Sequence, residues 1–173
     1  MIYLMSIDPG LRGCGVAVFD KAKARLLRAA YVVNPNTKER GYKAHALMAR
    51  EVANWLAREM KTLPAALSCV IIELPRIYPG PQQQKGDLND LLDVTGVGSA
   101  FAALCNPGAV QHVIPSEWKG QVPKKVMNER VLRALDNVEV GNVRHAGSKD
   151  HNTLDGVGIG LNYFGRINRK VYA

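Results

Sequence analysis

The sequence predicts an α/β fold in which a mixed sheet of five strands has helices on both faces. Short apolar runs that suit buried strands come first, and further strands then alternate with segments of helical periodicity. Apolar residues make up 47% of the chain and charged residues 22%, which is typical of a packed globule. With 173 residues and no internal repeat or linker, we expect a single domain over residues 1–173.

Three strands are expected at the start, joined as an antiparallel meander. Residues 2–8 are apolar on both faces and are followed by Pro9 and Gly10, which suits a strand buried between helix layers. Residues 13–20 predict the second strand, and residues 26–33 the third.

The rest of the chain alternates between helices and strands. Apolar residues at helical spacing predict an amphipathic helix over 37–61, and the run at 69–73 predicts a buried strand. The proline-rich residues 74–86 predict a long loop. The elements expected after it are a helix capped by Asp87 and running to about 104, a strand at 109–114, a loop at 115–122, a basic helix at 124–135, an irregular segment at 136–148 and a helix at 150–163.

The chain is strongly basic. It has 23 Lys and Arg against 15 Asp and Glu, a formal net charge of +8. This favours a polyanionic partner, because each basic side chain that neutralises a phosphate releases counterions. A merely soluble basic surface is the alternative.

Membrane insertion and secretion are not expected. No apolar run free of charge is long enough to cross a bilayer, and residues 1–7 lack the basic start of a secretory signal. The 3 cysteines, Cys14, Cys69 and Cys105, form no CxxC pair, and an odd number cannot make a closed disulfide framework. We therefore expect reduced, structural thiols and a cytoplasmic protein.

Three carboxylates stand where apolar elements would not otherwise need them. Asp8 ends the first strand, Glu73 ends the strand at 69–73, and Asp155 lies among apolar residues of the last helix. An acid on an apolar face is costly unless it is paired or holds a cation. If the three converge, their oxygens suit Mg²⁺ or Mn²⁺. Singly, each has an ordinary explanation, such as a turn at Asp8 or an ion pair of Glu73 with Arg76.

The start of the last helix offers further candidates. His151 precedes Asp155 by four residues, so both project from one face, and the histidine could bind an ion or accept a proton from water. A solvated or core histidine is the alternative. Asp150 is better placed to cap the helix. Asn152 has a carbonyl but no charge.

The glycines after Asp8 let the backbone pass close to the acid and leave room for a phosphate. The pattern Asp-x-Gly-x-x-x-x-Gly-Val-Ala-Val-x-Asp at residues 8–20 is shared by the actin-like and sugar-kinase ATPases and by the ribonuclease H-like nucleases. The ATPases need two such domains and a second phosphate loop. The chain holds one, so we expect no nucleotide cofactor.

The chain resembles the RuvC-type Holliday junction resolvases of the ribonuclease H-like superfamily over nearly its whole length. Four motifs in order carry the resemblance, at residues 6–18, 70–73, 115–119 and 151–161. It implies a homodimer that cuts branched DNA with two Mg²⁺ or Mn²⁺ ions per site, held by Asp8, Glu73 and Asp155. Two metal ions in such a site lower the pKa of an attacking water molecule and stabilise the leaving 3′ oxygen.

Two departures separate the sequence from the family pattern. The family has Asp or His three residues before the final Asp, where this chain has Asn152, with His151 one position earlier. The segment 120–125 is also shorter than its counterpart. These departures indicate a divergent, phage-type member in a bacterial cell or an infected host. A broader flap or ribonuclease H-type nuclease, or a catalytically silent nucleic-acid-binding module, are the alternatives.

Basic and aromatic side chains are the candidate DNA contacts. Tyr78 is the candidate wedge at a branch point, because base stacking on an aromatic ring contributes about 1–3 kcal/mol. Solvated helix faces, or packing of Tyr78 on the loop prolines, are the alternatives. The basic candidates are Lys119 in its Pro-x-x-x-Lys motif, Arg76, Lys124, Lys125 and Arg130.

Gly96 and Gly98 interrupt a predicted helix at a cost of about 1 kcal/mol each, which close packing would explain. The resemblance places a two-fold dimer contact at this helix.

Overall fold

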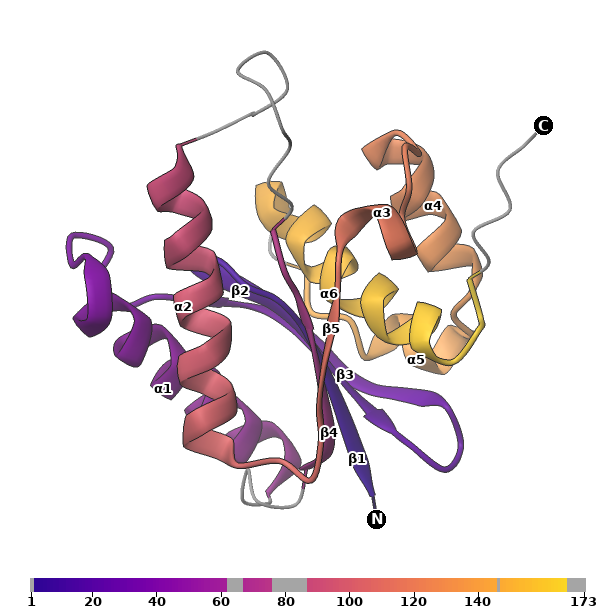
Figure 1. Ribbon diagram of the computed structural model, residues 1–173. Coiled ribbons are helices and arrows are strands. Elements are labelled where there is room, and N and C mark those ends of the chain that lie inside the picture. The colour runs from indigo at the N-terminus through magenta and orange to yellow at the C-terminus, as the bar shows by residue number, and fades with distance from the viewer. Residues whose placement is uncertain (1, 62–66, 76–86, 146, 168–173) are drawn as a thin grey trace.

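The computed structural model describes residues 2–61, 67–75, 87–145 and 147–167. They form a five-stranded sheet in the order β3-β2-β1-β4-β5, with helices on both faces (Figure 1). The mixed sheet expected from the sequence is therefore confirmed. The strands are β1 Tyr3–Asp8, β2 Gly13–Asp20, β3 Arg25–Val33, β4 Leu67–Glu73 and β5 Val110–Val113. The helices are α1 Gly41–Met60, α2 Leu88–Cys105, α3 Pro115–Trp118, α4 Lys124–Arg133, α5 Asn137–Gly141 and α6 Asp150–Tyr163.

The strand pairing brings the ends of β1 and β4 together. Strands β1, β2 and β3 form the expected antiparallel meander, while β1 and β4 run parallel, as do β4 and β5. Ile7 pairs with Ile72. The next residue on each strand is an acid, Asp8 and Glu73, so the register delivers two carboxylates to the same edge of the sheet.

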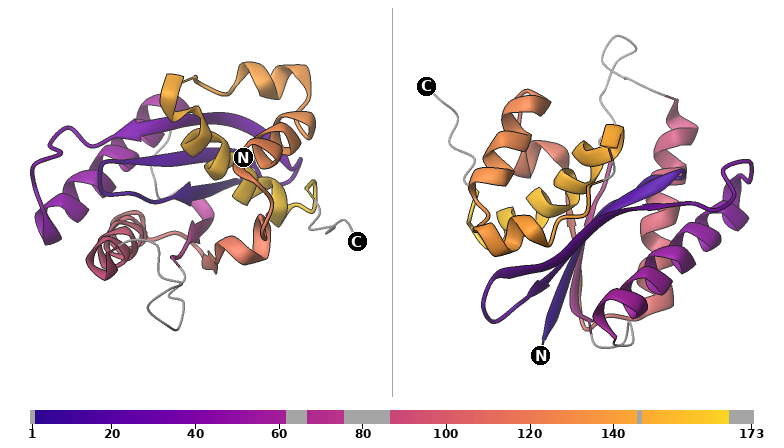
Figure 2. Two further views of the ribbon diagram at one scale, coloured as in Figure 1. Left: turned by 90° about the horizontal axis from the view of Figure 1, so that it is seen from above. Right: turned by 180° about the vertical axis from the view of Figure 1, so that it is seen from behind.

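Two helix layers enclose the sheet. Helices α1 and α2 cover one face, and α6 with α3, α4 and α5 covers the other (Figure 2). Successive residues of β1 point to opposite faces: Met5 belongs to the core under α1 and α2, and Leu4 to the core under α6. Burial on both faces explains why β1 reads as a continuous apolar run.

Helix α6 packs directly on the sheet through glycines. A Cβ atom at Gly156 would lie 2.7 Å from the Gly15 carbonyl carbon, and one at Gly15 would lie 1.8 Å from the Asn152 carbonyl oxygen. Neither position has room for a side chain. The buried Ser6 hydroxyl donates to the Gly156 carbonyl at 2.7 Å, which fixes the helix on β1. This close approach determines the depth at which Asp155 lies over the strand ends.

The glycines of α2 also serve packing within the chain. A Cβ atom at Gly96 would lie 2.4 Å from the His45 ring of α1, and one at Gly98 would lie 2.8 Å from Ile72 Cγ2 of β4. The predicted close packing is therefore present. The dimer contact stays a prediction.

Two segments expected to be irregular contain short helices. Residues 115–118 form α3, whose N-terminus is closed by the Glu117 carboxylate accepting from the Ile114 N–H at 2.9 Å. Residues 137–141 form α5, capped by Asp136, which accepts from the Glu139 N–H at 2.8 Å. Helices this short hold too few residues to show apolar periodicity, so the pattern could not reveal them.

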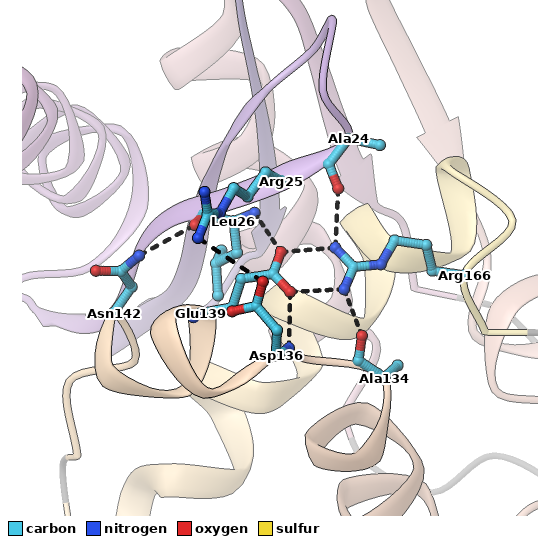
Figure 3. A network of polar contacts seen from close by, with 8 residues as sticks. All are labelled: Ala24, Arg25, Leu26, Ala134, Asp136, Glu139, Asn142 and Arg166. Atoms are coloured by element: carbon cyan, nitrogen blue, oxygen red, sulfur yellow. Dashed lines mark hydrogen bonds and ion pairs between the residues drawn. The ribbon is translucent and has the colours of Figure 1, made fainter.

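A buried ion pair ties the far end of the α6 layer to the β2–β3 turn. Glu139 is 1% exposed. Its carboxylate accepts hydrogen bonds from two Arg166 guanidinium nitrogens, each at 2.6 Å, and from the Leu26 N–H at 2.8 Å (Figure 3). Arg166 also donates to the carbonyls of Ala24 and Ala134. Burial by itself would raise the pKa of Glu139, but the hydrogen bonds from Arg166 and the backbone lower it to about 2.

The three cysteines are buried and unpaired, in agreement with their expected structural role. Within the parts of the chain that the structure describes, no helix combines the length and apolarity that a bilayer crossing requires.

Candidate active site

Asp8, Glu73 and Asp155 meet at one edge of the sheet. Asp8 and Glu73 end the neighbouring parallel strands β1 and β4. Asp155 comes from α6, whose glycines allow the helix to pack closely on the sheet near those strand ends. Glu73 is 9% exposed and Asp155 is 7% exposed. The convergence expected from the sequence is thus visible in the electrostatics: each of the charges on Glu73 and Asp155 acts on Asp8.

The site disfavours three bare negative charges. Burial, followed by repulsion from Glu73 and Asp155, raises the pKa of Asp8 well above its usual range. Burial also raises the pKa of Glu73 and of Asp155, although the nearby ammonium of Lys119 acts in the opposite direction on both. A cluster of acids with raised pKa values is typical of a functional site, because such a cluster binds protons or cations readily.

Lys119 and Trp118 lie directly against the carboxylates. The Lys119 Nζ is 3.5 Å from Glu73 Oε2 and 3.9 Å from Asp155 Oδ1. The indole N–H of the buried Trp118 donates to the same Glu73 oxygen. The ammonium also lies 4.7 Å from the centroid of the Trp118 ring, a cation–π contact. Helix α3 and the residue after it therefore supply the acids with both a donor and a cation.

The donor set fits Mg²⁺ or Mn²⁺ in its chemistry, since these hard cations prefer carboxylate oxygens. As they stand, no three His, Cys, Asp or Glu side chains among the described residues are arranged around one ion position. The ammonium of Lys119 instead lies near two of the three acids.

A cavity of about 260 Å³ opens beside the acids. It lies between the turn after α3 and the start of α4, and its wall contains Asp155, Lys119 and Lys124. The lining residues are Lys119, Gly120, Gln121, Val122, Lys124, Met127 and Asp155. An anionic group in this cavity would contact basic side chains on one side while remaining next to Asp155.

The three residues at the start of α6 have different surroundings. His151 is partly exposed, and its charge acts on Asp155 to lower the pKa of that carboxyl. The Asn152 side chain bonds the Tyr31 hydroxyl. The capping role predicted for Asp150 is wrong: Lys149 is the N-cap residue, and Asp150 Oδ2 lies 3.2 Å from His145 Nδ1 instead.

The predicted DNA contacts are divided between two surfaces. Lys119 and Lys124 line the cavity beside the acids, and Lys125 is exposed next to them on α4. Arg130 belongs to a second cavity of about 280 Å³, which it lines with Arg133, Ala134, Arg166 and Ile167. Arg76 and Tyr78 lie outside the described residues.

Sequence reasoning missed the contact of Trp118 with Glu73. The structure pairs Glu73 with Lys119 and Trp118, while Arg76, the partner considered from the sequence, lies outside the described residues. The sequence did contain a signal for these contacts, because Trp118 and Lys119 both belong to the Pro115–Lys119 motif. The contact could not be read from that motif, because the position of a four-residue helix over the strand end depends on the whole α6 layer.

A scan of protein-family models and a search of the curated proteins each found no match. Solved structures do match. RuvC of Thermus thermophilus in complex with a Holliday junction substrate is 19% identical, covers 96% of this chain and 96% of its own, and superposes with a TM-score of 0.59. A second structure of Thermus thermophilus RuvC is 18% identical, with 95% of this chain and 97% of its own covered and a TM-score of 0.59.

The yeast mitochondrial Holliday junction resolvase Ydc2 is also similar, at 12% identity and a TM-score of 0.52 over 94% of this chain and 78% of its own. Identities this low establish the fold and leave the activity to be argued from the site. Strand order, helix layers and near-complete coverage agree with the sequence motifs: the chain has the ribonuclease H-like fold of the RuvC-type Holliday junction resolvases.

Proposed function

We propose that the protein is a metal-dependent endonuclease that cuts branched DNA, four-way junctions in particular. The observation that carries the proposal is the meeting of Asp8, Glu73 and Asp155 at one edge of a ribonuclease H-like sheet. Three clustered, buried carboxylates destabilise the folded state, which indicates that they are kept for a function. Cation binding is the function that suits their oxygens.

The three acids would hold two Mg²⁺ or Mn²⁺ ions. The chemistry supplied there would be a lowered pKa of an attacking water and neutralisation of charge on the phosphate and the leaving 3′ oxygen. The protein's own groups do the rest. The cavity wall beside Asp155 holds the phosphate through Lys119 and Lys124, and His151, partly exposed at the head of α6, can accept a proton from water.

DNA as the partner is supported by charge and by similarity. The net charge of +8 attracts a polyanion. The solved structure that shares this fold over 96% of the chain is a protein bound to a Holliday junction. Lys125 and Arg130 of α4 add basic side chains beyond the cavity beside Asp155, and we assign them to the phosphates of a DNA arm.

A homodimer is part of the proposal, because symmetric cutting of a four-way junction needs two sites. Helix α2 leaves large apolar side chains in solvent on one face, where Leu88 and Leu92, one turn apart, are 53% and 66% exposed. Such a face is typical of an interface. Sedimentation of the protein at micromolar concentration should give the mass of a dimer, and a monomer there would remove this part of the proposal.

A panel of synthetic substrates tests the activity. Four-way junctions, flaps and RNA–DNA hybrids of matched length are incubated with Mg²⁺, with Mn²⁺ or with EDTA. We expect paired nicks in the junction that depend on the divalent ion and leave 5′ phosphates. Equal cutting of hybrids or flaps would indicate a broader nuclease, and binding without cutting under every condition would indicate a nucleic-acid-binding module.

A further inference from the structure

We propose that Lys119 is a built-in competitor of the divalent ions: in the metal-free protein its ammonium group stands in for them between Glu73 and Asp155, and ion binding displaces it toward the phosphate cavity. The inference rests on the proposed function in one respect, that the three acids bind divalent ions.

The position of the ammonium supports this role. Its nitrogen lies 3.5 Å from Glu73 Oε2 and 3.9 Å from Asp155 Oδ1, so a single positive charge serves two acids from different elements. A unit positive charge within 4 Å of two buried carboxylates is attracted by both. An ion that binds both acids must therefore replace this interaction.

The backbone holds the lysine in reach while the side chain stays movable. The N–H groups of Lys119 and Gly120 both bond to the Pro115 carbonyl, at 3.0 and 3.1 Å, which fixes the end of α3. The ammonium is held at long distances: it lies 3.5 Å from Glu73 Oε2, with which it forms a long hydrogen bond, and 3.9 Å from Asp155 Oδ1, and the lysine side chain is 27% exposed. A flexible four-carbon chain can move such a group without a change in the fold.

The cavity provides the place to which the ammonium would move. Lys119 lines the same cavity of about 260 Å³ as Asp155 and Lys124. Released from Glu73, the ammonium would face the space that we assign to the phosphate. One side chain would then serve as counter-ion to the acids before the ions bind and as a phosphate contact afterwards, so that loading of ions and gripping of DNA are coupled.

The test measures ion binding in the absence of DNA. Mn²⁺ is titrated into the wild-type protein, Lys119→Met and Lys124→Met by calorimetry at one pH and ionic strength. Lys124 is the matched control: its charge acts on Asp8 and Asp155, yet it forms no ion pair with them among the described residues. We expect Lys119→Met to bind Mn²⁺ about tenfold more tightly than wild type, and Lys124→Met to gain much less.

The outcomes separate the inference from the proposed function. If wild type and Lys119→Met bind Mn²⁺ equally, or if both lysine variants gain equally, the competition is overturned and the ion site stands. If neither wild type nor Lys119→Met binds Mn²⁺, the metal site itself fails. Binding by Lys119→Met alone supports the competition in its strongest form.

A second readout does not depend on the folding of a lysine variant. The chain has 2 tryptophans, so Trp55→Phe leaves Trp118 as the single emitter, in contact with both Lys119 and Glu73. We expect Mg²⁺ to change the Trp118 emission as the ammonium leaves its ring. Calorimetric ion binding with no change in emission would overturn the displacement.

Discussion

The proposed chemistry depends on three acids whose burial is unfavourable for their charged forms. Asp8, Glu73 and Asp155 lose hydration on folding, and each has its pKa raised by that burial. Lys119 and the indole N–H of Trp118 offset part of this cost. Asp8 has neither of these contacts among the described residues, so it bears most of the remaining repulsion and is the residue at which substitution is most informative.

Asp8→Asn should reduce cutting of a four-way junction by at least about 10³-fold, because one ligand charge is lost from the ion site. Binding of the same junction in EDTA should be retained or become tighter, because a negative charge facing the phosphate is removed. Cutting is followed on labelled junctions and binding by gel shift. Asp90→Asn makes the same change on an exposed turn of α2 and should leave both properties unchanged. Normal cutting by Asp8→Asn would place the site elsewhere.

The same substitution should stabilise the metal-free protein at pH 8. The folded-state pKa of Asp8 is raised above its ordinary value of 3.8, so wild-type stability declines as pH rises from that value through the raised pKa. Asn carries no charge. Its advantage, on the order of 1 kcal/mol, should be present at pH 8 and disappear near pH 4. Urea unfolding in EDTA at both pH values measures it, and an advantage that is equal at the two values would contradict the linkage.

At the scale of elements, the glycines of α6 decide where the site forms. Gly156, Gly158 and Gly160 contact Gly15, Trp118 and Phe19, respectively, with no space for a Cβ atom. Glycine lowers helix propensity, so a run of them in a helix is retained for the close approach that it permits. The sequence placed this helix at the right residues, 150–163, but its periodicity did not reveal that Gly156 and Gly160 face the sheet and Gly158 faces α3 and α4.

Gly156→Ala should destabilise the fold by about 1–3 kcal/mol and reduce ion binding, because a methyl group 2.7 Å from the Gly15 backbone forces α6 away from β2. Gly141→Ala is the control. Its added methyl group would meet nothing within 4 Å, and alanine favours the helical conformation, so stability should stay equal or rise. Denaturant midpoints with unchanged slopes give the comparison. Equal midpoints for Gly156→Ala and wild type would mean that α6 can shift without cost.

At the scale of the whole molecule, the buried pair of Glu139 and Arg166 joins parts that lie far apart along the chain. It connects α5, the residues after the C-terminal end of α6 and the β2–β3 turn (Figure 3). The acids are destabilising and this network is stabilising. The layer that carries Asp155 is therefore anchored at a distance from the site.

Glu139→Gln should lower the free energy of unfolding by roughly 3 kcal/mol at pH 7, because it leaves the Arg166 charge without its partner. The folded-state pKa of Glu139 is about 2 against an ordinary 4.5, so its contribution is full above about pH 4.5 and is lost as pH falls toward 2. The free energies of unfolding of wild type and Glu139→Gln should therefore become equal as the pH falls toward 2. Glu129→Gln, which breaks an exposed pair with Arg133, should cost less than about 0.5 kcal/mol. A similar loss in both variants would contradict the anchoring role.

The sequence by itself determined the strands, the long helices and the mixed sheet, and it singled out the three acids that the structure brings together. These follow from local patterns: apolar runs, helical spacing, and charges placed where an apolar element has no use for them. Arg76 and Tyr78 stay sequence predictions, since they lie outside the described residues.

Only the tertiary structure decided what surrounds the acids. The four-residue helix α3, the contact of Trp118 and Lys119 with Glu73, and the pairing of Asp150 with His145 join residues that no local pattern relates. Their positions depend on how closely α6 packs on the sheet, which is set by atoms on two elements at once. Periodicity reports which face of an element is buried, whereas the distance between two buried faces is fixed by the side chains that meet there.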